Sequence, residues 1–185
     1  MLALLLLVGG IFLRLTPHIA NFAPISATAL FGGAYLNKRF AILVPLAAIA
    51  ISDYLLLYVN PFSNPVVNFS HIQPISAMFH STTLYVWGSF TISGLIGIWL
   101  KNRVKPSNVI AASFLASLQF FVITNFGVWA GGMYSRGLDG LVQSYIMGLP
   151  FFRWTLMGDL FYTGVFFGAY EFAIITNKKI KFALN

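Results

Sequence analysis

Long apolar runs with almost no charge leave this chain few ways to fold in water. Stretches such as FAILVPLAAIA at 40–50 and SGLIGIWL at 93–100 are nearly continuous. Only 8% of the residues are charged, whereas soluble domains carry about 25%. The runs approach the roughly 20 apolar residues that cross a bilayer, and they lack the alternation of an outer-membrane strand. The sequence therefore predicts an all-α integral membrane protein.

Three short basic clusters each follow an apolar run, at residues 38–39, 101–105 and 178–181. Because Lys and Arg accumulate in the cytoplasmic loops of membrane proteins, we interpret the net charge of +7 as a sign of membrane orientation. The basic residues form no continuous stripe, so a nucleic-acid partner is not expected. The predicted partner of the surface is the lipid bilayer.

The apolar pattern predicts a single transmembrane domain over residues 1–185, with both termini in the cytoplasm. We read the first run as a retained helix, since no positive segment precedes it and no cleavage site follows it. Leucines and other apolar residues recur at helical spacing between 138 and 149, which predicts a short amphipathic helix on the outer surface. The six predicted spans are residues 2–16, 23–37, 40–59, 79–100, 108–131 and 151–176.

Small residues four positions apart occur in several of these spans. Such pairs let membrane helices approach closely, and internal packing is their ordinary role. The pairs are Ala29/Gly33, Ser93/Gly97, Ala112/Ala116 and Gly164/Gly168.

Polar, aromatic and ionisable residues converge on the predicted outer face. An Asp at the centre of a membrane helix costs roughly 2.5–3.5 kcal/mol, yet two of the four acidic residues fall inside predicted spans, in their outer halves. Polar groups over an apolar base describe a cup rather than a channel, which needs polar positions along its full depth. We therefore predict a small-molecule site formed by Arg14, His18, Asn21, Asp53, His80, Tyr85, Asn125, Trp129, Tyr134, Arg153 and Asp159.

Structural roles compete with binding for several of these residues. The outer arginines either recognise a carboxylate, phosphate or amide or extend to lipid headgroups. Asp53 and Asp159 either belong to a site or form an ion pair or cap that holds the bundle. Glu171 lies near the inner boundary, where it either reaches the surface or meets a lysine of the tail.

Catalytic signatures are missing from the sequence. It contains no Cys, no HExxH, no GxSxG and no Walker A motif, so thiol chemistry, the common hydrolase motifs and ATP hydrolysis are not expected. No cofactor of its own is expected either. Two alternatives stay open: an intramembrane enzyme that uses Asp53 and Asp159 as an acid–base pair, and a structural or assembly subunit.

Five stretches together resemble a known group of transporters. They are an apolar first helix that ends in Arg14, PHIANFAPISATALFGGAYL at 17–36, ISD at 51–53, TNFGVWAGGMY at 124–134 and LPFFRWTLMGDLFYT at 149–163. In layout and in these motifs the chain resembles the substrate-binding S-components of energy-coupling factor (ECF) vitamin transporters, or an uncharacterised group close to them.

The resemblance implies a six-helix bundle in the bacterial cytoplasmic membrane that captures a vitamin or related micronutrient at its extracellular face. It also implies a separate coupling subunit and two ATPases as partners. The coupling helix of those proteins carries an AxxxA surface, but the first helix here has only Gly9 and Gly10, so a solitary protein is an open alternative.

Cobalamin is the first substrate suggested by this comparison. Neutral imidazole is a suitable ligand for a transition metal, so His18 or His80 could approach the cobalt of the substrate from the outer face. In that arrangement Arg153, Asn125 and Trp129 would contact the side chains of the corrin.

Overall fold

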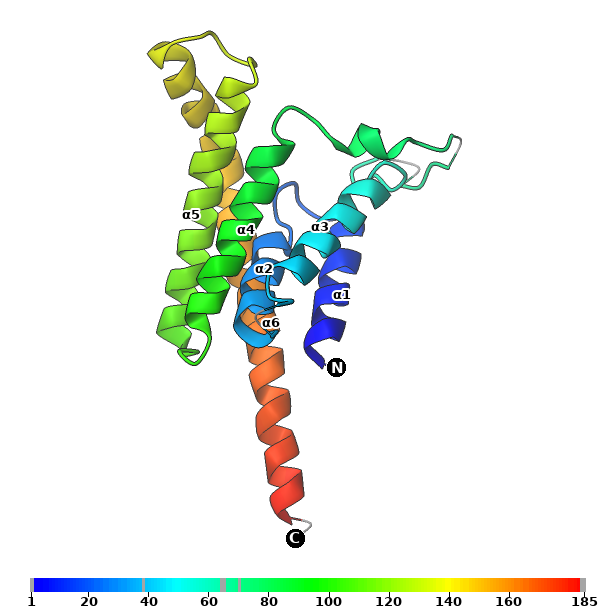
Figure 1. Cartoon of the computed structure of the whole chain (residues 1–185), viewed down its shortest axis with the longest axis vertical. Coiled ribbons are helices and arrows are strands. Elements are labelled where there is room, and N and C mark those ends of the chain that lie inside the picture. The colour runs from blue at the N-terminus through cyan, green and yellow to red at the C-terminus, as the bar shows by residue number, and fades with distance from the viewer. Residues whose placement is uncertain (1, 38, 64–65, 70, 184–185) are drawn as a thin grey trace.

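The computed structural model describes residues 2–37, 39–63, 66–69 and 71–183, with side chains as far as residue 177. The regular structure is almost entirely helical, apart from an isolated β-bridge between Val59 and Val67. This confirms the predicted all-α class (Figure 1). The elements are α1 (Leu2–Leu15), α2 (Ile25–Tyr35), α3 (Leu43–Leu55), the 3-10 turn η1 (Ile75–Met78), α4 (Thr83–Leu100), α5 (Pro106–Ala130) and α6 (Leu138–Ala183).

The helices alternate in direction, as the sequence predicted. Figure 1 shows α1, α3 and α5 running upward and α2, α4 and α6 running downward. The connections at 16–24, 56–82 and 131–137 therefore gather at the upper end, which we call the loop end. The N-terminus and the connections at 36–42 and 101–105 lie toward the opposite end, which we call the basic end.

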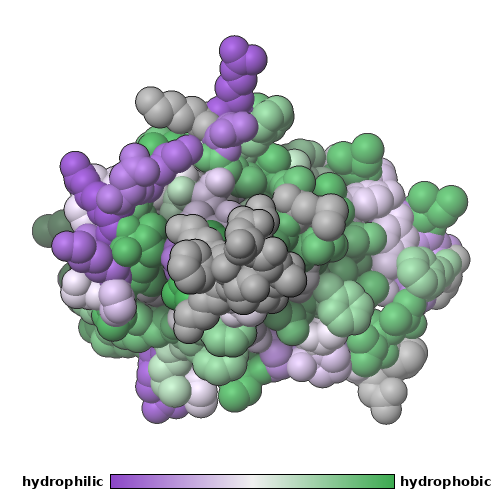
Figure 2. Space-filling view, turned by 90° about the horizontal axis from the view of Figure 1, so that it is seen from below, coloured by the Kyte–Doolittle hydropathy of each residue, from purple (hydrophilic) through white to green (hydrophobic). Residues whose placement is uncertain are grey.

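Hydrophilic residues at the basic end lie around its edge. Figure 2 views this end from below and shows hydrophilic atoms on the left and at the top, beside a largely hydrophobic surface. Lys101 and Arg103 lie in the α4–α5 connection. The Lys101 Nζ donates a hydrogen bond to the Leu36 carbonyl oxygen at 3.0 Å. This lysine therefore also binds a backbone oxygen at the end of α2, which α2 itself cannot satisfy.

Helix α2 forms the centre of the bundle, because every residue from Ser26 to Ala34 is buried. Its closest neighbour is α4. A Cβ added at Gly33 would lie 2.2 Å from the Gly94 carbonyl oxygen, and one added at Gly97 would lie 2.2 Å from the Leu30 carbonyl oxygen. Only glycine fits at such a backbone approach. The pairs Ala29/Gly33 and Ser93/Gly97 thus meet at one interface, which confirms their predicted role.

The other two small-residue pairs differ from each other. Ala112 and Ala116 are fully buried, as internal packing requires. The prediction for Gly164 and Gly168 was wrong, because a Cβ at either position would meet nothing within 4 Å. Both glycines instead line a cavity of about 500 Å³ between α5 and α6.

Helix α6 differs most from the prediction. The expected surface helix at 138–149 and the expected span at 151–176 are one helix of 46 residues that passes through Pro150. A proline inside a helix removes one hydrogen bond, but both sides of Pro150 pack on α5. The space beside Gly148 is filled by the Asn125 side chain, and the Phe152 ring lies 4.8 Å from that of Phe121. These contacts outweigh the local break.

Several helices are shorter than their predicted spans. α2 has 11 residues and α3 has 13, which at 1.5 Å per residue gives roughly 16 and 20 Å, against a hydrocarbon core of about 30 Å. Within the described residues, two helices, α4 and α5, are long and apolar enough to cross a membrane.

Large apolar side chains form exposed stripes along the helices. On α5 the stripe repeats every four residues, and a second one runs along α1 through Leu5, Val8 and Phe12. Exposed apolar surface of this extent marks contact with a membrane or a partner. The α5 stripe consists of Ile110, Phe114, Leu118, Val122 and Phe126.

Candidate functional site

An ion pair near the loop end joins three helices. The Arg14 guanidinium lies 2.6 Å from Asp53 Oδ1 and also donates to the Ser52 hydroxyl. The Trp87 indole N–H donates to Asp53 Oδ2 at 2.9 Å. Both charged side chains are less than one-fifth exposed. Since both carboxylate oxygens have protein partners, this network holds α1, α3 and α4 together.

Asp159 lies in a different interface, between α2, α5 and α6. It is 1% exposed. Its carboxylate accepts a hydrogen bond from the Ser117 hydroxyl at 2.7 Å, and the Ser26 hydroxyl of α2 lies nearby. It shares no partner with Asp53, so the two acids that sequence reasoning placed together belong to separate networks.

Asn21 and Asn125 meet at a cavity of about 140 Å³ near the loop end, which we call the amide cavity. Asn21 has a φ of 64°, a left-handed conformation that Asn tolerates better than most residues. The Asn125 amide N–H donates to the Phe121 carbonyl oxygen at 2.8 Å, and the Asn125 oxygen lies against Gly148, where an added Cβ would be 2.3 Å away. The other lining residues are Phe120, Phe121, Thr124, Gly148, Phe151, Phe152 and Thr155.

Both candidate histidines make local contacts through Nδ1. His18 Nδ1 lies 2.7 Å from the Thr16 carbonyl oxygen, and the His18 ring meets Phe62 edge-on with centroids 5.3 Å apart. His80 Nδ1 lies 2.8 Å from the Thr82 hydroxyl. No group of three or more His, Asp or Glu side chains able to hold a metal ion occurs in the described part of the chain.

The remaining predicted site residues lie at the loop end without lining the amide cavity. Tyr85 packs against Gly127, where an added Cβ would lie 2.5 Å from its ring. Trp129 has a buried indole N–H with no hydrogen-bond partner among the described residues. Arg153 is exposed and lies over the Trp154 ring, 4.8 Å from its centroid. Tyr134 is half-buried just beyond α5.

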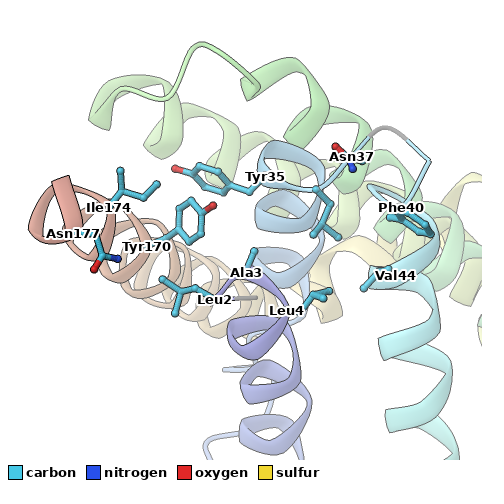
Figure 3. Close-up of a pocket in the computed structure, with 11 residues that line it drawn as sticks. Leu2, Ala3, Leu4, Tyr35, Asn37, Phe40, Val44, Tyr170, Ile174 and Asn177 are labelled. Carbon is cyan, nitrogen blue, oxygen red and sulfur yellow. The ribbon is translucent and has the colours of Figure 1, made fainter. Parts of the chain in front are cut away.

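A larger cavity, which sequence reasoning missed, lies at the basic end. It measures about 640 Å³ and is bounded by the start of α1, the end of α2, residues of the α2–α3 connection and the lower half of α6. Figure 3 shows Tyr35 and Tyr170 side by side at its edge, with ring centroids 4.2 Å apart. The Tyr35 hydroxyl donates to the Glu171 carboxylate. Tyr35 and Tyr170 are both visible in the sequence, but nothing in the sequence indicates that their rings pack together.

The sequence of the chain matches one family over nearly its whole length. The family's sequence model covers residues 1–182. The chain belongs to the family of unknown function DUF6580. No curated protein and no solved structure matches it. The DUF6580 match includes the Arg14–Asp53–Trp87 network, the buried Asp159 and the amide cavity, so all three lie within the segment that defines the family.

Proposed function

We propose that this DUF6580 protein crosses the membrane with a bundle of six helices and binds a small molecule at its loop end, for uptake of a vitamin or related micronutrient. The basic end would face the cytoplasm and the loop end the outside of a bacterial cytoplasmic membrane. Two features support this placement: the exposed apolar stripes on α1 and α5, and basic residues concentrated at one end, as in cytoplasmic loops.

Short helices do not exclude such a bundle. α2 is shielded from lipid by its neighbours, since its residues from Ser26 to Ala34 are buried. Irregular backbone beside a short helix is tolerated at membrane depth when protein surrounds it. α1 and α3 would reach across with the help of their adjoining loops.

The amide cavity is the single observation that carries the binding proposal. Its phenylalanine rings offer flat apolar faces, while Asn21 and Asn125 offer amide donors and acceptors. This combination suits a small planar ring with polar edges. Its volume of about 140 Å³ is below the roughly 300–1,000 Å³ of pockets for larger ligands. A corrin would therefore have to bind above it, within reach of His18 or His80.

The two carboxylates give less support to an enzyme. Asp53 is paired with Arg14, and Asp159 accepts from Ser117 in another helix interface. An acid–base pair needs both groups at one reacting centre.

In uptake, an ECF coupling subunit with its ATPases would be the partner at the basic end. Gly10 is not free to dock it, because Thr28 fills the space beside it.

The binding proposal is tested with the purified protein and a panel of vitamins that includes cobalamin, by calorimetry. Asn21→Gly removes an amide but keeps the left-handed backbone. Asn102→Gly is the matched control, since Asn102 has a φ of 66° at the opposite end. A bound vitamin should lose about fivefold in affinity in Asn21→Gly, the value of a hydrogen bond of about 1 kcal/mol, and nothing in Asn102→Gly.

Two results would overturn the proposal. One is the absence of binding to every compound of the panel. The other is equal affinity in Asn21→Gly and the parent protein. A co-purifying protein in fixed ratio, with no bound small molecule, would point to the assembly subunit instead.

A further inference from the structure

The buried carboxylate of Asp159 lacks a positive partner. The described part of the chain contains one ion pair, between Arg14 and Asp53, and Asp159 is 1% exposed. Taking an ionised carboxylate out of water costs several kcal/mol unless a counter-charge is present. Two neutral hydroxyl groups, from Ser117 and Ser26, do not provide that charge.

Two further hydroxyl groups, one helical turn along α5 from Ser117 and one along α6 from Asp159, are buried without a hydrogen bond in the described residues. Ser113 and Thr163 are at most 1% exposed, and their hydroxyl oxygens have no partner in the described residues. In membrane helices such a hydroxyl usually bonds to the carbonyl oxygen four residues earlier. That bond is made here by Ser89, Thr91, Ser93, Ser117, Thr124, Thr155 and Thr176.

The pairing of α5 with α6 places these groups at neighbouring levels. The two helices are antiparallel (Figure 1). Phe121 and Thr155 line one cavity between them, and Val109 and Phe167 line another. Between these two levels, the Ser117 hydroxyl bonds to Asp159. One helical turn toward the basic end from that bond, α5 presents Ser113 and α6 presents Thr163.

We propose that a sodium ion binds between α5 and α6, held by the Asp159 carboxylate and the hydroxyl oxygens of Ser117, Ser113, Thr163 and Ser26. Hard cations take oxygen ligands of these kinds. A single carboxylate neutralises one positive charge, whereas a divalent ion would leave an excess charge in an apolar interior. Asp159, Ser113, Ser117 and Thr163 are each at most 1% exposed, so their oxygens would replace the water that a bound sodium ion gives up.

The proposed ion site is separate from the amide cavity. Asp159 lies one turn below Thr155, which lines that cavity, and none of the proposed sodium ligands lines it. The ion site therefore goes beyond the vitamin-binding proposal, and its test does not depend on whether a vitamin binds.

Thermal unfolding of the purified full chain in NaCl and in choline chloride of equal ionic strength tests the site. A ligand that binds only the folded state raises the melting temperature with its concentration. We expect a saturable rise in NaCl of about 4 °C or more, the shift that about 1–2 kcal/mol produces in a chain of this size. Calorimetric titration with NaCl should show the same midpoint.

Two variants and one control sharpen the test. Asp159→Asn keeps one acceptor oxygen but removes the charge, so the sodium effect should disappear. Thr163→Val removes an unpartnered hydroxyl, so it should weaken sodium binding at least tenfold. It should not lower the melting temperature in choline chloride. Thr91→Val, whose hydroxyl bonds to the Trp87 carbonyl oxygen, should leave the sodium midpoint unchanged.

Melting temperatures that coincide in NaCl and choline chloride would overturn the proposal. So would a sodium midpoint that Thr163→Val leaves unaltered, because a water molecule or an empty space between the hydroxyls would then account for the geometry. Thr163→Val tests the sodium site even if Asp159→Asn does not fold.

Discussion

Arg14, Asp53 and Trp87 show how three residues distant in sequence fix the positions of three helices. The guanidinium supplies donors in a rigid fork, and the indole N–H binds the second oxygen of the carboxylate. Removing one member of a buried pair is costly because the other is left without a counter-charge. The structural role that the sequence left open for Asp53 is therefore the one that the geometry supports.

A double-mutant cycle tests this role. Asp53→Asn should lower the free energy of unfolding by about 2 kcal/mol, less than the 3–5 kcal/mol of a fully buried pair, because both side chains retain some exposure. Arg14→Met with Asp53→Asn should cost less than the sum of the two single changes, with a coupling of about 1–2 kcal/mol. Thermal unfolding in one detergent measures all three variants. Strictly additive costs would contradict the network.

Helix α2 owes its place at the centre to small residues on both sides of its contact with α4. Because backbone atoms of the two helices approach at Gly33 and Gly97, no larger side chain fits there. Gly164 and Gly168 carry the same spacing on α6 but open onto a cavity. One sequence pattern thus has two structural meanings, which the partner helix decides.

Matched glycine substitutions separate these meanings. Gly33→Ala should destabilise the protein by about 1–3 kcal/mol, as expected for overpacking against a rigid backbone. Gly168→Ala should stabilise it by about 0.5–1 kcal/mol, because it removes a flexible residue from a helix without a clash. The comparison is made by thermal unfolding. A loss of stability in Gly168→Ala equal to that in Gly33→Ala would contradict the described packing.

For the whole molecule, local sequence patterns were enough to predict the helical class and the alternating direction of the helices, but not their number, because the expected surface helix and the last span are one helix. Hydrophobic runs and basic clusters are short-range features, so they can be read without knowing any contact. Partners such as Trp87 for Asp53, or Ser117 for Asp159, depend on the register between helices and could not be predicted. The continuity of α6 through Pro150 was missed for the same reason, since contacts with α5 outweigh a local helix breaker.

For the candidate site, too, local patterns could be predicted and contacts between helices could not. The sequence predicted that polar residues would gather at one end, and Asn21 and Asn125 do meet there in one cavity. It did not predict that Asp159 would lie in a helix interface with hydroxyl groups instead. The free-energy cost of a charged side chain inside a membrane helix identifies unusual residues, but it does not indicate which of them share a site.

Labelling of single cysteines in intact cells tests the central claim most directly, that the protein spans the membrane with its loop end outside. The natural chain has no Cys, so each introduced thiol is the only target. Ser76→Cys lies in η1 at the loop end and Ser107→Cys at the start of α5 at the basic end, and both serines are exposed. A membrane-impermeant maleimide should label Ser76→Cys in intact cells and Ser107→Cys only after the membrane is opened. Labelling of both in intact cells, or of Ser107→Cys alone, would contradict the account.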